Sequence, residues 1–205
     1  MISRGYTVKS YAQTIASRRS IYSISDNLSI SDEELSALVA AALEATPSAF
    51  NAQAARAVIL LGQQHQHFWQ LVSAALRDTL SDDEFWEADE RVDGFADGYG
   101  TILFFEDEAV LAAAAAEAGA DASELASWGD QECAIALYNV WNMLEDVGVG
   151  ASVQHYGALV DAPMRAKWGI APEWRLVAQM PFGEFDSLPQ DKDVVAGASR
   201  LRVFK

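Results

Sequence analysis

Cysteine and proline are scarce in this sequence, with one Cys and five Pro among 205 residues. The lone cysteine, Cys133, excludes a disulfide framework and fits a reducing compartment. Its place inside an apolar stretch is more typical of a small buried hydrophobe than of a catalytic thiol. The opening residues lack the continuous apolar core of a signal peptide, so we expect a cytoplasmic protein.

Positive charge is also scarce, because 14 Lys and Arg face 30 Asp and Glu and the net charge is −16. Nucleic acids and anionic membranes need a basic surface, so we expect neither as a partner. Between Arg19 and Arg165 only three basic residues occur, and the others gather near the two ends of the chain. Chain ends often lie close together in a folded domain, so they could form one anion site. Ordinary solvated charge on the termini is the simpler interpretation of composition alone.

The motifs of several catalytic classes are missing: there is no P-loop, H-E-x-x-H, C-x-x-C or G-x-S-x-G. Gly148 and Gly150 begin a dinucleotide-like pattern, but Val153 replaces its third glycine and the pattern follows a helix. His65 and His67 are two residues apart, which places them on different faces of a helix, so we expect no metal site. If the chain is an enzyme, we expect a bound cofactor, and no side chain, to supply the reactive centre.

What the sequence does contain is a long apolar stretch from Asp121 to Val147. Apolar residues recur there at helical spacing and small residues fill much of the remaining circumference, which predicts a helix buried in a core or between subunits. Asp121 and Glu124 form a capping-box pattern at its start, and Gly148 and Gly150 can close its end. Polar residues interrupt every apolar window, which excludes a membrane span.

Shorter patterns predict the other elements. The expected helices cover about residues 8–17, 29 or 31 to 45, 63–80, 82–93, 106–118 and 160–168. The expected strands cover residues 56–61, 99–105, 151–156 and 174–180, with a possible edge strand at 201–204. A few strands among more helices, without repeats or long linkers, predict one α+β domain over residues 1–205. The acidic helix that carries Phe85 and Trp86 is interpreted as an amphipathic surface helix; a lid over a ligand is the alternative.

Two short segments carry groups suited to binding. Residues 18–20 (Arg-Arg-Ser) follow a predicted helix, and two guanidinium groups with a hydroxyl can bind phosphate. The loop at 46–53 offers Ser48, Asn51 and Gln53, uncharged hydrogen-bonding groups that suit a neutral heteroaromatic ring. Surface charge and ordinary turn formation are the structural alternatives for the two segments.

Several stretches taken together resemble the FMN-dependent nitroreductase family, from about residue 12 to residue 204. They are the helix leading into residues 18–20, TPSAFNAQ (46–53), GYGTILFFED (98–107), GASVQHY (150–156), AQMPFG (178–183) and the tail 192–200. More narrowly, they resemble the short branch that includes yeast fatty-acid-repression-mutant proteins and a copper-induced lactococcal nitroreductase. Each motif is weak alone, but their order along the chain is specific.

The resemblance implies an α+β nitroreductase-like sandwich, in which helices flank a central antiparallel or mixed sheet and the long helix is buried. It also implies an intertwined homodimer that binds FMN at its interface. The implied activity is an oxidoreductase that takes hydride from NADH or NADPH and reduces nitroaromatic or quinone-type acceptors in a ping-pong cycle. The acidic surface favours NADH slightly. Three alternatives stay open: a lipid peroxide or enone acceptor, a flavin-binding regulator of stress response or lipid metabolism with low turnover, and a helical scaffold without cofactor.

The resemblance assigns basic residues near both chain ends to the flavin. Arg18 and Ser20 match positions that hold its phosphate and ribityl chain, and Arg19 matches a position beside the ring. Lys192 and Arg200 match tail residues that close on the phosphate. The residues before Arg200 depart from the usual proline- and glutamate-containing stretch, which predicts a looser loop there.

Uncharged groups are assigned to the ring in the same way. Ser48, Asn51 and Gln53 match the loop that the partner subunit lends to the cofactor. Gln154 and His155 match the segment whose backbone lies against the isoalloxazine, where an amide can face N5. The resemblance implies no catalytic side chain and no metal, because the chemistry takes place on the flavin.

Overall fold

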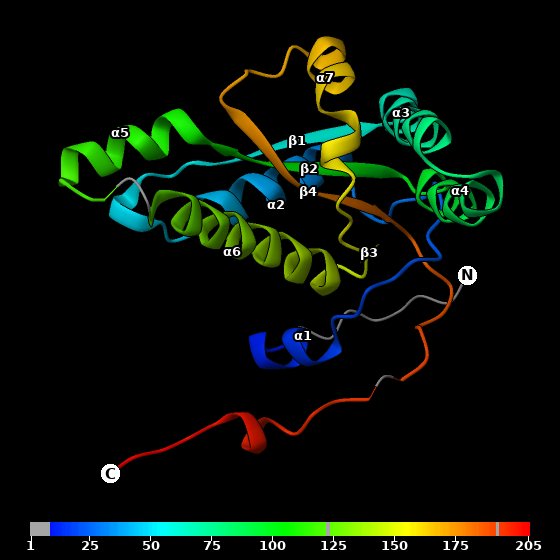
Figure 1. The fold of residues 1–205 in the computed structure, drawn as a ribbon. Helices are drawn as coiled ribbons and strands as arrows, with labels where there is room; N and C mark the ends of the chain where they lie inside the picture. The colour runs from blue at the N-terminus through cyan, green and yellow to red at the C-terminus, as the bar shows by residue number, and fades with distance from the viewer. Residues whose placement is uncertain (1–8, 122–123, 192) are drawn as a thin grey trace.

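The computed structural model describes residues 9–121, 124–191 and 193–205, and a four-stranded antiparallel sheet lies at its centre (Figure 1). The strands are β1 (Ala55–Leu61), β2 (Gly100–Asp107), β3 (Gly150–Ala151) and β4 (Trp174–Gly183). Their order is β1-β2-β4-β3, so β2 and β4 occupy the middle. Every residue of β2 is buried. The predicted α+β sandwich around an antiparallel sheet is confirmed.

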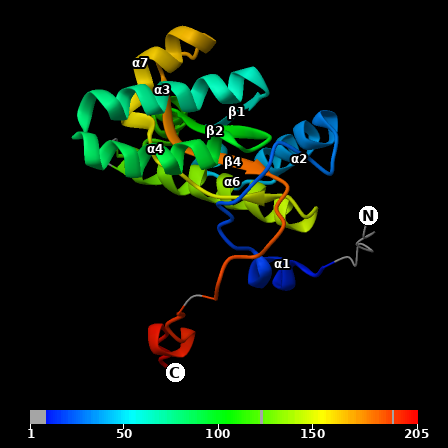
Figure 2. The same cartoon turned by 90° about the vertical axis from the view of Figure 1, so that its right-hand side faces the viewer.

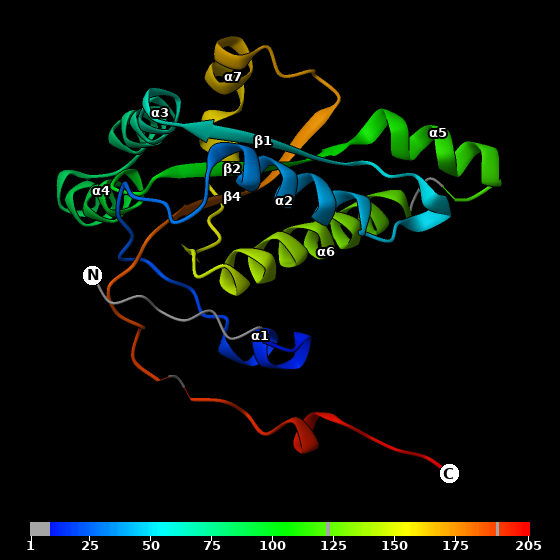
Figure 3. The ribbon, with the colours of Figure 1, turned by 180° about the vertical axis from the view of Figure 1, so that it is seen from behind.

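Helices cover both faces of this sheet (Figures 2 and 3). One face holds α3 (Gln63–Thr79), α4 (Asp82–Ala96) and α7 (Gly157–Trp168), and the other holds α2 (Asp32–Glu44) and α6 (Leu125–Asp146). Successive side chains of a strand point to opposite faces. Leu103 and Phe105 of β2 accordingly join the core with α3, α4 and α7, whereas Ile102 and Phe104 join the core with α2 and α6.

The long helix α6 has 22 residues, which makes it about 33 Å long. It begins at Leu125, later than expected, and its N-cap Glu124 makes no side-chain capping bond. The capping box predicted from Asp121 spans residues 122 and 123, which lie outside the described residues. Glu124 has helical backbone angles, and its amide donates to the Asp121 carbonyl at 3.2 Å. One side of α6 packs against the sheet and is buried, while Ile135 on another side is 39% exposed.

The remaining helices are α1 (Tyr11–Ser17) and α5 (Glu108–Ala118), with 3-10 turns η1 (Ala49–Asn51) and η3 (Gly197–Arg200). Ser31 caps α2 through a capping box, as one of the two expected serines. The described residues contain no helix that is long and apolar enough to span a membrane.

Two strand predictions need correction. The strand expected over 151–156 is only two residues long, Gly150–Ala151, because regular pairing with β4 ends after the Ser152 amide donates to the Pro181 carbonyl, and only a single bridge between Gln154 and Gln179 follows. The edge strand expected over 201–204 is absent: those residues are exposed on a tail that leads away from the body, and they pair with no strand of the described residues (Figure 1).

Candidate functional site

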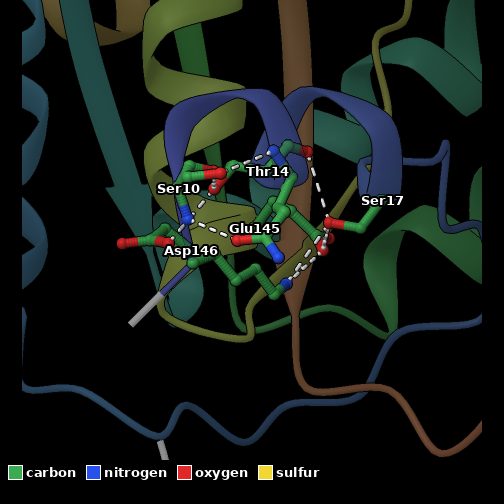
Figure 4. A network of polar contacts seen from close by, with 7 residues as sticks. Ser10, Thr14, Ser17, Glu145 and Asp146 are labelled. Carbon is green, nitrogen blue, oxygen red and sulfur yellow. Dashed lines mark hydrogen bonds and ion pairs between the residues drawn. The ribbon is translucent and has the colours of Figure 1, made fainter. Parts of the chain in front are cut away.

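The short helix α1 is fixed to the C-terminal end of α6 by polar contacts (Figure 4). Lys9 and Ser17 both donate to Glu145 Oε1 at 2.7 Å, and Thr14 Oγ1 donates to Asp146 Oδ1 at 3.2 Å. Carboxylates at a helix C-terminus oppose the helix dipole, and the Lys9 ammonium compensates for this. The segment that follows α1, residues 18–20, therefore begins at a defined place beside α6.

Arg18 is half-buried immediately after α1 and carries unpaired hydrogen-bond donors. Its Nε and Nη1 atoms are buried and have no hydrogen-bond partner. Its guanidinium carbon lies 3.9 Å from the centre of the Trp141 ring on α6. Buried guanidinium groups normally pair with acceptors, so this one fits an anionic ligand such as the phosphate of FMN.

Arg19 and Ser20 are also half-buried and continue toward the edge of the sheet. Arg19 Nη2 donates to the Gln190 carbonyl at 2.6 Å, which brings the start of the C-terminal tail to this site. One residue after Ser20, the Ile21 amide donates to the Ala151 carbonyl of β3 at 2.9 Å. The basic segment is therefore anchored between the tail and the edge strand.

The segment after β3 is held against β4. The Gln154 and Gln179 backbones exchange hydrogen bonds of 2.7 and 2.9 Å, and the buried Gln179 side chain accepts from the Tyr156 amide at 2.6 Å. Gln179 Nε2 is buried without a partner. Gln154 is half-buried and His155 is exposed. The structure therefore brings Gln154 and residues 18–21 to the same edge of the sheet.

A cavity of about 730 Å3 opens beside Gln154, and most of its lining residues carry no motif in the sequence. Its walls come from the segment after residue 20, from α4 and from the segment after β3. The lining residues are Tyr22, Ser23, Ile24, Glu90, Arg91, Gly94, Phe95, Asp97, Gln154 and Tyr156. Arg91 is one of only three basic residues between Arg19 and Arg165, and that isolation is the one sequence signal that could have indicated this cavity.

Helix α4 lines this cavity through its last turns, while its first aromatic residues pack elsewhere. Phe85 is buried, and Trp86 is 62% exposed and stacks near Arg77 at 4.9 Å from ring centre to guanidinium carbon. Neither residue lines the cavity. These two aromatics therefore match the expected surface helix and not a lid.

The loop with Ser48, Asn51 and Gln53 lies at the other end of α6. Phe50 on η1 packs edge-on to Trp128 near the start of that helix, with ring centres 5.4 Å apart. Within one chain, Phe50 lies on Trp128 and Arg18 on Trp141, which are 13 residues, or about 20 Å, apart along α6. The structure therefore does not bring the two groups of expected site residues together in a single subunit.

This loop has an unusual backbone. Phe50, Asn51 and Gln53 have φ values of 53°, 57° and 54°, a region that non-glycine residues adopt at a cost of about 1–3 kcal/mol each. Ser48 Oγ accepts from the Gln53 amide at 3.0 Å and helps to fix the shape. Strained backbone of this kind is concentrated at binding sites.

The basic tail is only partly placed. Arg200 is exposed on η3, and Lys192 lies outside the described residues. His65 is buried, and its ring nitrogens hydrogen-bond to Thr101 Oγ1 at 2.8 Å and to the Ala96 carbonyl at 3.0 Å. Across the described ranges, no group of three or more His, Cys, Asp or Glu residues could hold a metal ion.

The profile of the Nitroreductase family matches residues 15–184 of the chain. The chain therefore belongs to the nitroreductase family, a class of oxidoreductases. It is 31% identical to the putative nitroreductase HBN1 of Saccharomyces cerevisiae over 190 residues, which cover 92% of this chain and 94% of that protein. The resemblance seen in the sequence is thereby confirmed.

Solved structures share the fold. The nitroreductase CinD of Lactococcus lactis, in complex with chloramphenicol, has 30% identity and a TM-score of 0.86, with 96% of this chain and 100% of that chain covered. A nitroreductase with bound FMN from Desulfitobacterium hafniense has 16% identity and a TM-score of 0.70, with 97% and 100% covered. At 16% identity, the similarity to the Desulfitobacterium protein shows a shared fold and nothing about function.

Proposed function

We propose that this chain is an FMN-dependent oxidoreductase that takes hydride from NADH or NADPH and reduces nitroaromatic or quinone-type acceptors in a ping-pong cycle. The observation that carries the proposal is the buried guanidinium of Arg18, whose Nε and Nη1 have no partner, in a chain of the nitroreductase family. An anionic cofactor would pair these donors.

The chain's own residues would bind and orient the cofactor. Arg18 and Ser20 would hold the phosphate and ribityl chain, Arg19 would lie beside the ring, and Lys192 and Arg200 of the tail would close on the phosphate. The backbone of Gln154 and His155 would lie against the ring. FMN, when bound, supplies the N5 atom that accepts and passes on hydride.

Arg91 adds a cation to the cavity next to Gln154. It pairs with Glu87 at 2.5 Å on the same helix, and both side chains are exposed. A cation near the pyrimidine end of the ring would stabilise negative charge on the reduced cofactor. Cavity aromatics such as Tyr22 and Phe95 suit planar ligands and help to exclude water.

The active unit would be a homodimer that binds FMN at its interface. The loop with Ser48, Asn51 and Gln53 packs through Phe50 on Trp128, about 20 Å along α6 from the Trp141 that contacts Arg18, so a second copy of the chain would have to supply this loop to the site. The exposed Ile135 on α6 and the strained loop both support such an arrangement.

The charge around the site favours uncharged acceptors. Glu90 and Asp97 line the cavity, and the chain has a net charge of −16. Acidic groups repel anionic ligands, so NADH would be preferred to NADPH, which has an additional phosphate. CinD structures are complexes with chloramphenicol and with 4-nitrophenol, two nitroaromatic compounds. The buried free thiol of Cys133 agrees with a cytoplasmic location.

A visible absorbance spectrum of the purified protein tests this proposal first. We expect a yellow protein that releases about one FMN per subunit on heating and oxidises NADH when 4-nitrophenol or a quinone is added. Bound FMN without turnover would favour the alternative, a flavin-binding regulator of stress response or lipid metabolism. A colourless protein that takes up no added FMN would contradict the proposal.

A further inference from the structure

The buried side of Arg18 faces an aromatic ring. Its guanidinium carbon lies 3.9 Å from the centre of the Trp141 ring and 6.0 Å from that of Tyr138. The first distance is that of a close cation–π contact, whereas the second is at its outer limit of about 6 Å. A ring that covers the flat face of a guanidinium leaves the N–H groups at its edge free. Two of these, Nε and Nη1, have no partner.

Trp141 is itself fixed in place by the strand edge. Its indole N–H donates to the Ala151 carbonyl at 3.2 Å, and the same oxygen accepts the Ile21 amide at 2.9 Å. The indole and the chain three residues after Arg18 thus share one acceptor. A Cβ on the neighbouring Gly150 would lie 2.7 Å from Phe185 Cδ1 and 3.0 Å from Ile21 Cγ2. The close approach of the Ile21 segment to β3 therefore depends on a glycine at position 150.

We infer that Trp141 is a positioning residue for cofactor binding: it holds the Arg18 guanidinium so that its unpaired N–H groups are available to an anionic group of the ligand. The inference rests on the proposed function, in which that anion is the FMN phosphate. Trp141 supplies attraction to the cation without taking up its donors, which a carboxylate partner would do. The charge of Arg18 is thereby kept for the ligand.

The affinity of the apoprotein for FMN, measured by quenching of flavin fluorescence, tests this role. Trp141→Leu removes the ring and should raise the Kd about tenfold. Trp141→Phe keeps an aromatic face and should stay within about threefold of the wild type. Trp86→Leu is the matched control, because it removes an exposed indole that stacks on Arg77 away from the cavity, and its Kd should not change.

A double-mutant cycle separates positioning from a general structural effect. If Trp141 acts through Arg18, Trp141→Leu should add little to the loss already caused by Arg18→Gln. Arg18→Lys keeps the charge but loses the planar stacking group, so it should also weaken FMN binding about tenfold. This variant leaves Trp141 in place and tests the inference even if Trp141→Leu does not fold, which circular dichroism would reveal.

The outcomes distinguish the inference from the proposed function. Wild-type affinity in Trp141→Leu or in Arg18→Lys, or full additivity in the cycle, would overturn the role of Trp141 and leave the flavin enzyme intact. A wild-type protein that takes up no FMN would overturn the proposed function, and this inference with it. Weaker binding in both variants, with rescue by Trp141→Phe and non-additivity, would support the inference.

Discussion

At the scale of single residues, His65 shows how the fold fixes a protonation state. A carbonyl only accepts, so Nε2 donates to Ala96, and Nδ1 must accept from the Thr101 hydroxyl, which in turn accepts from the Trp69 indole. Burial lowers the pKa of His65, and backbone contacts with Ala96 and Gly98 oppose this less strongly. The neutral ring is therefore part of the native structure.

This arrangement predicts a loss of stability in mild acid. The unfolded state takes up a proton below about pH 6.5 while the folded state does not, so the free energy of unfolding falls as the pH drops from 6.5 toward the lower folded pKa. His65→Gln should cost about 1–3 kcal/mol at pH 7.5 through its lost hydrogen bonds. Urea unfolding should show that the difference in unfolding free energy between the wild type and His65→Gln is smaller at pH 5.5 than at pH 7.5. An equal difference at the two pH values would contradict a neutral His65 in the folded state.

A glycine inside α6 gives a second prediction at this scale. A Cβ on Gly129 would overlap the carboxylate of Glu106, which is buried and paired with Arg175. Alanine normally stabilises a helix relative to glycine by about 1 kcal/mol. Here Gly129→Ala should instead destabilise the protein by about 1–3 kcal/mol, because the buried Glu106 carboxylate must move away from its position beside Arg175.

Helix α4 provides the matched control for that substitution. A Cβ on Gly94 would meet no atom within 4 Å, so Gly94→Ala should stabilise the apoprotein by about 0.5–1 kcal/mol. Thermal unfolding of the two variants should therefore move in opposite directions. A Gly129→Ala protein that is as stable as Gly94→Ala would show that the Glu106 carboxylate can move aside without lowering the free energy of unfolding.

At the scale of elements, periodicity and capping predicted most of the fold. Ser31 and the 3.6-residue spacing placed α2 well, and the β-branched and aromatic run placed β2, because these signals are local. The two-residue length of β3 depends on where its backbone pairing with β4 ends. No local sequence pattern predicts that position. The roles of Trp141 and Arg91 were missed for the same reason, since each depends on a contact with a distant segment.

The docking of α1 is a further property of an element and can be tested. Glu145→Ala removes the acceptor shared by Lys9 and Ser17, and should cost about 1–3 kcal/mol of the local stability that keeps α1 on α6. We expect faster amide hydrogen exchange in α1 and weaker FMN binding, because α1 leads directly into Arg18. Asp82→Asn, which removes an exposed ion pair with Arg77, should change neither. Unchanged hydrogen exchange in α1 would show that the hydrogen bond between Thr14 and Asp146 is enough to hold α1 on α6.

At the scale of the whole molecule, the sequence indicated which segments would form the site but not how far apart one chain leaves them. The basic chain ends suggested one anion site, and Arg19 does contact the start of the tail at Gln190. The loop that contains Asn51 packs on Trp128, about 20 Å along α6 from the Trp141 that contacts Arg18. A single sequence contains no local signal for a site completed by a second copy, so only the family resemblance pointed to it.

The C-terminal tail carries the prediction that belongs to the whole molecule. Its apolar side chains are exposed in the single chain: Leu188, Val194, Val195, Leu201, Val203 and Phe204. A partner that covered them would bury apolar area worth about 25 cal/mol per Å2, which favours a dimer. In sedimentation velocity we expect the full chain at twice its mass of 22.3 kDa, and a chain that ends at Asp186 as a weaker dimer or a monomer with less FMN.

A second variant separates the apolar tail from its charges. Replacing Leu201, Val203 and Phe204 together with Ser keeps Lys192 and Arg200, so this protein should dissociate at higher concentration than the wild type. Arg200→Ala should do the opposite, retaining the dimer while losing FMN affinity, because it removes a cation and little apolar surface. A dimer that withstands both truncation and the triple replacement would mean that α6 and the loop at residues 46–53 form the interface without the tail. The exposed apolar residues of the tail would then need another partner.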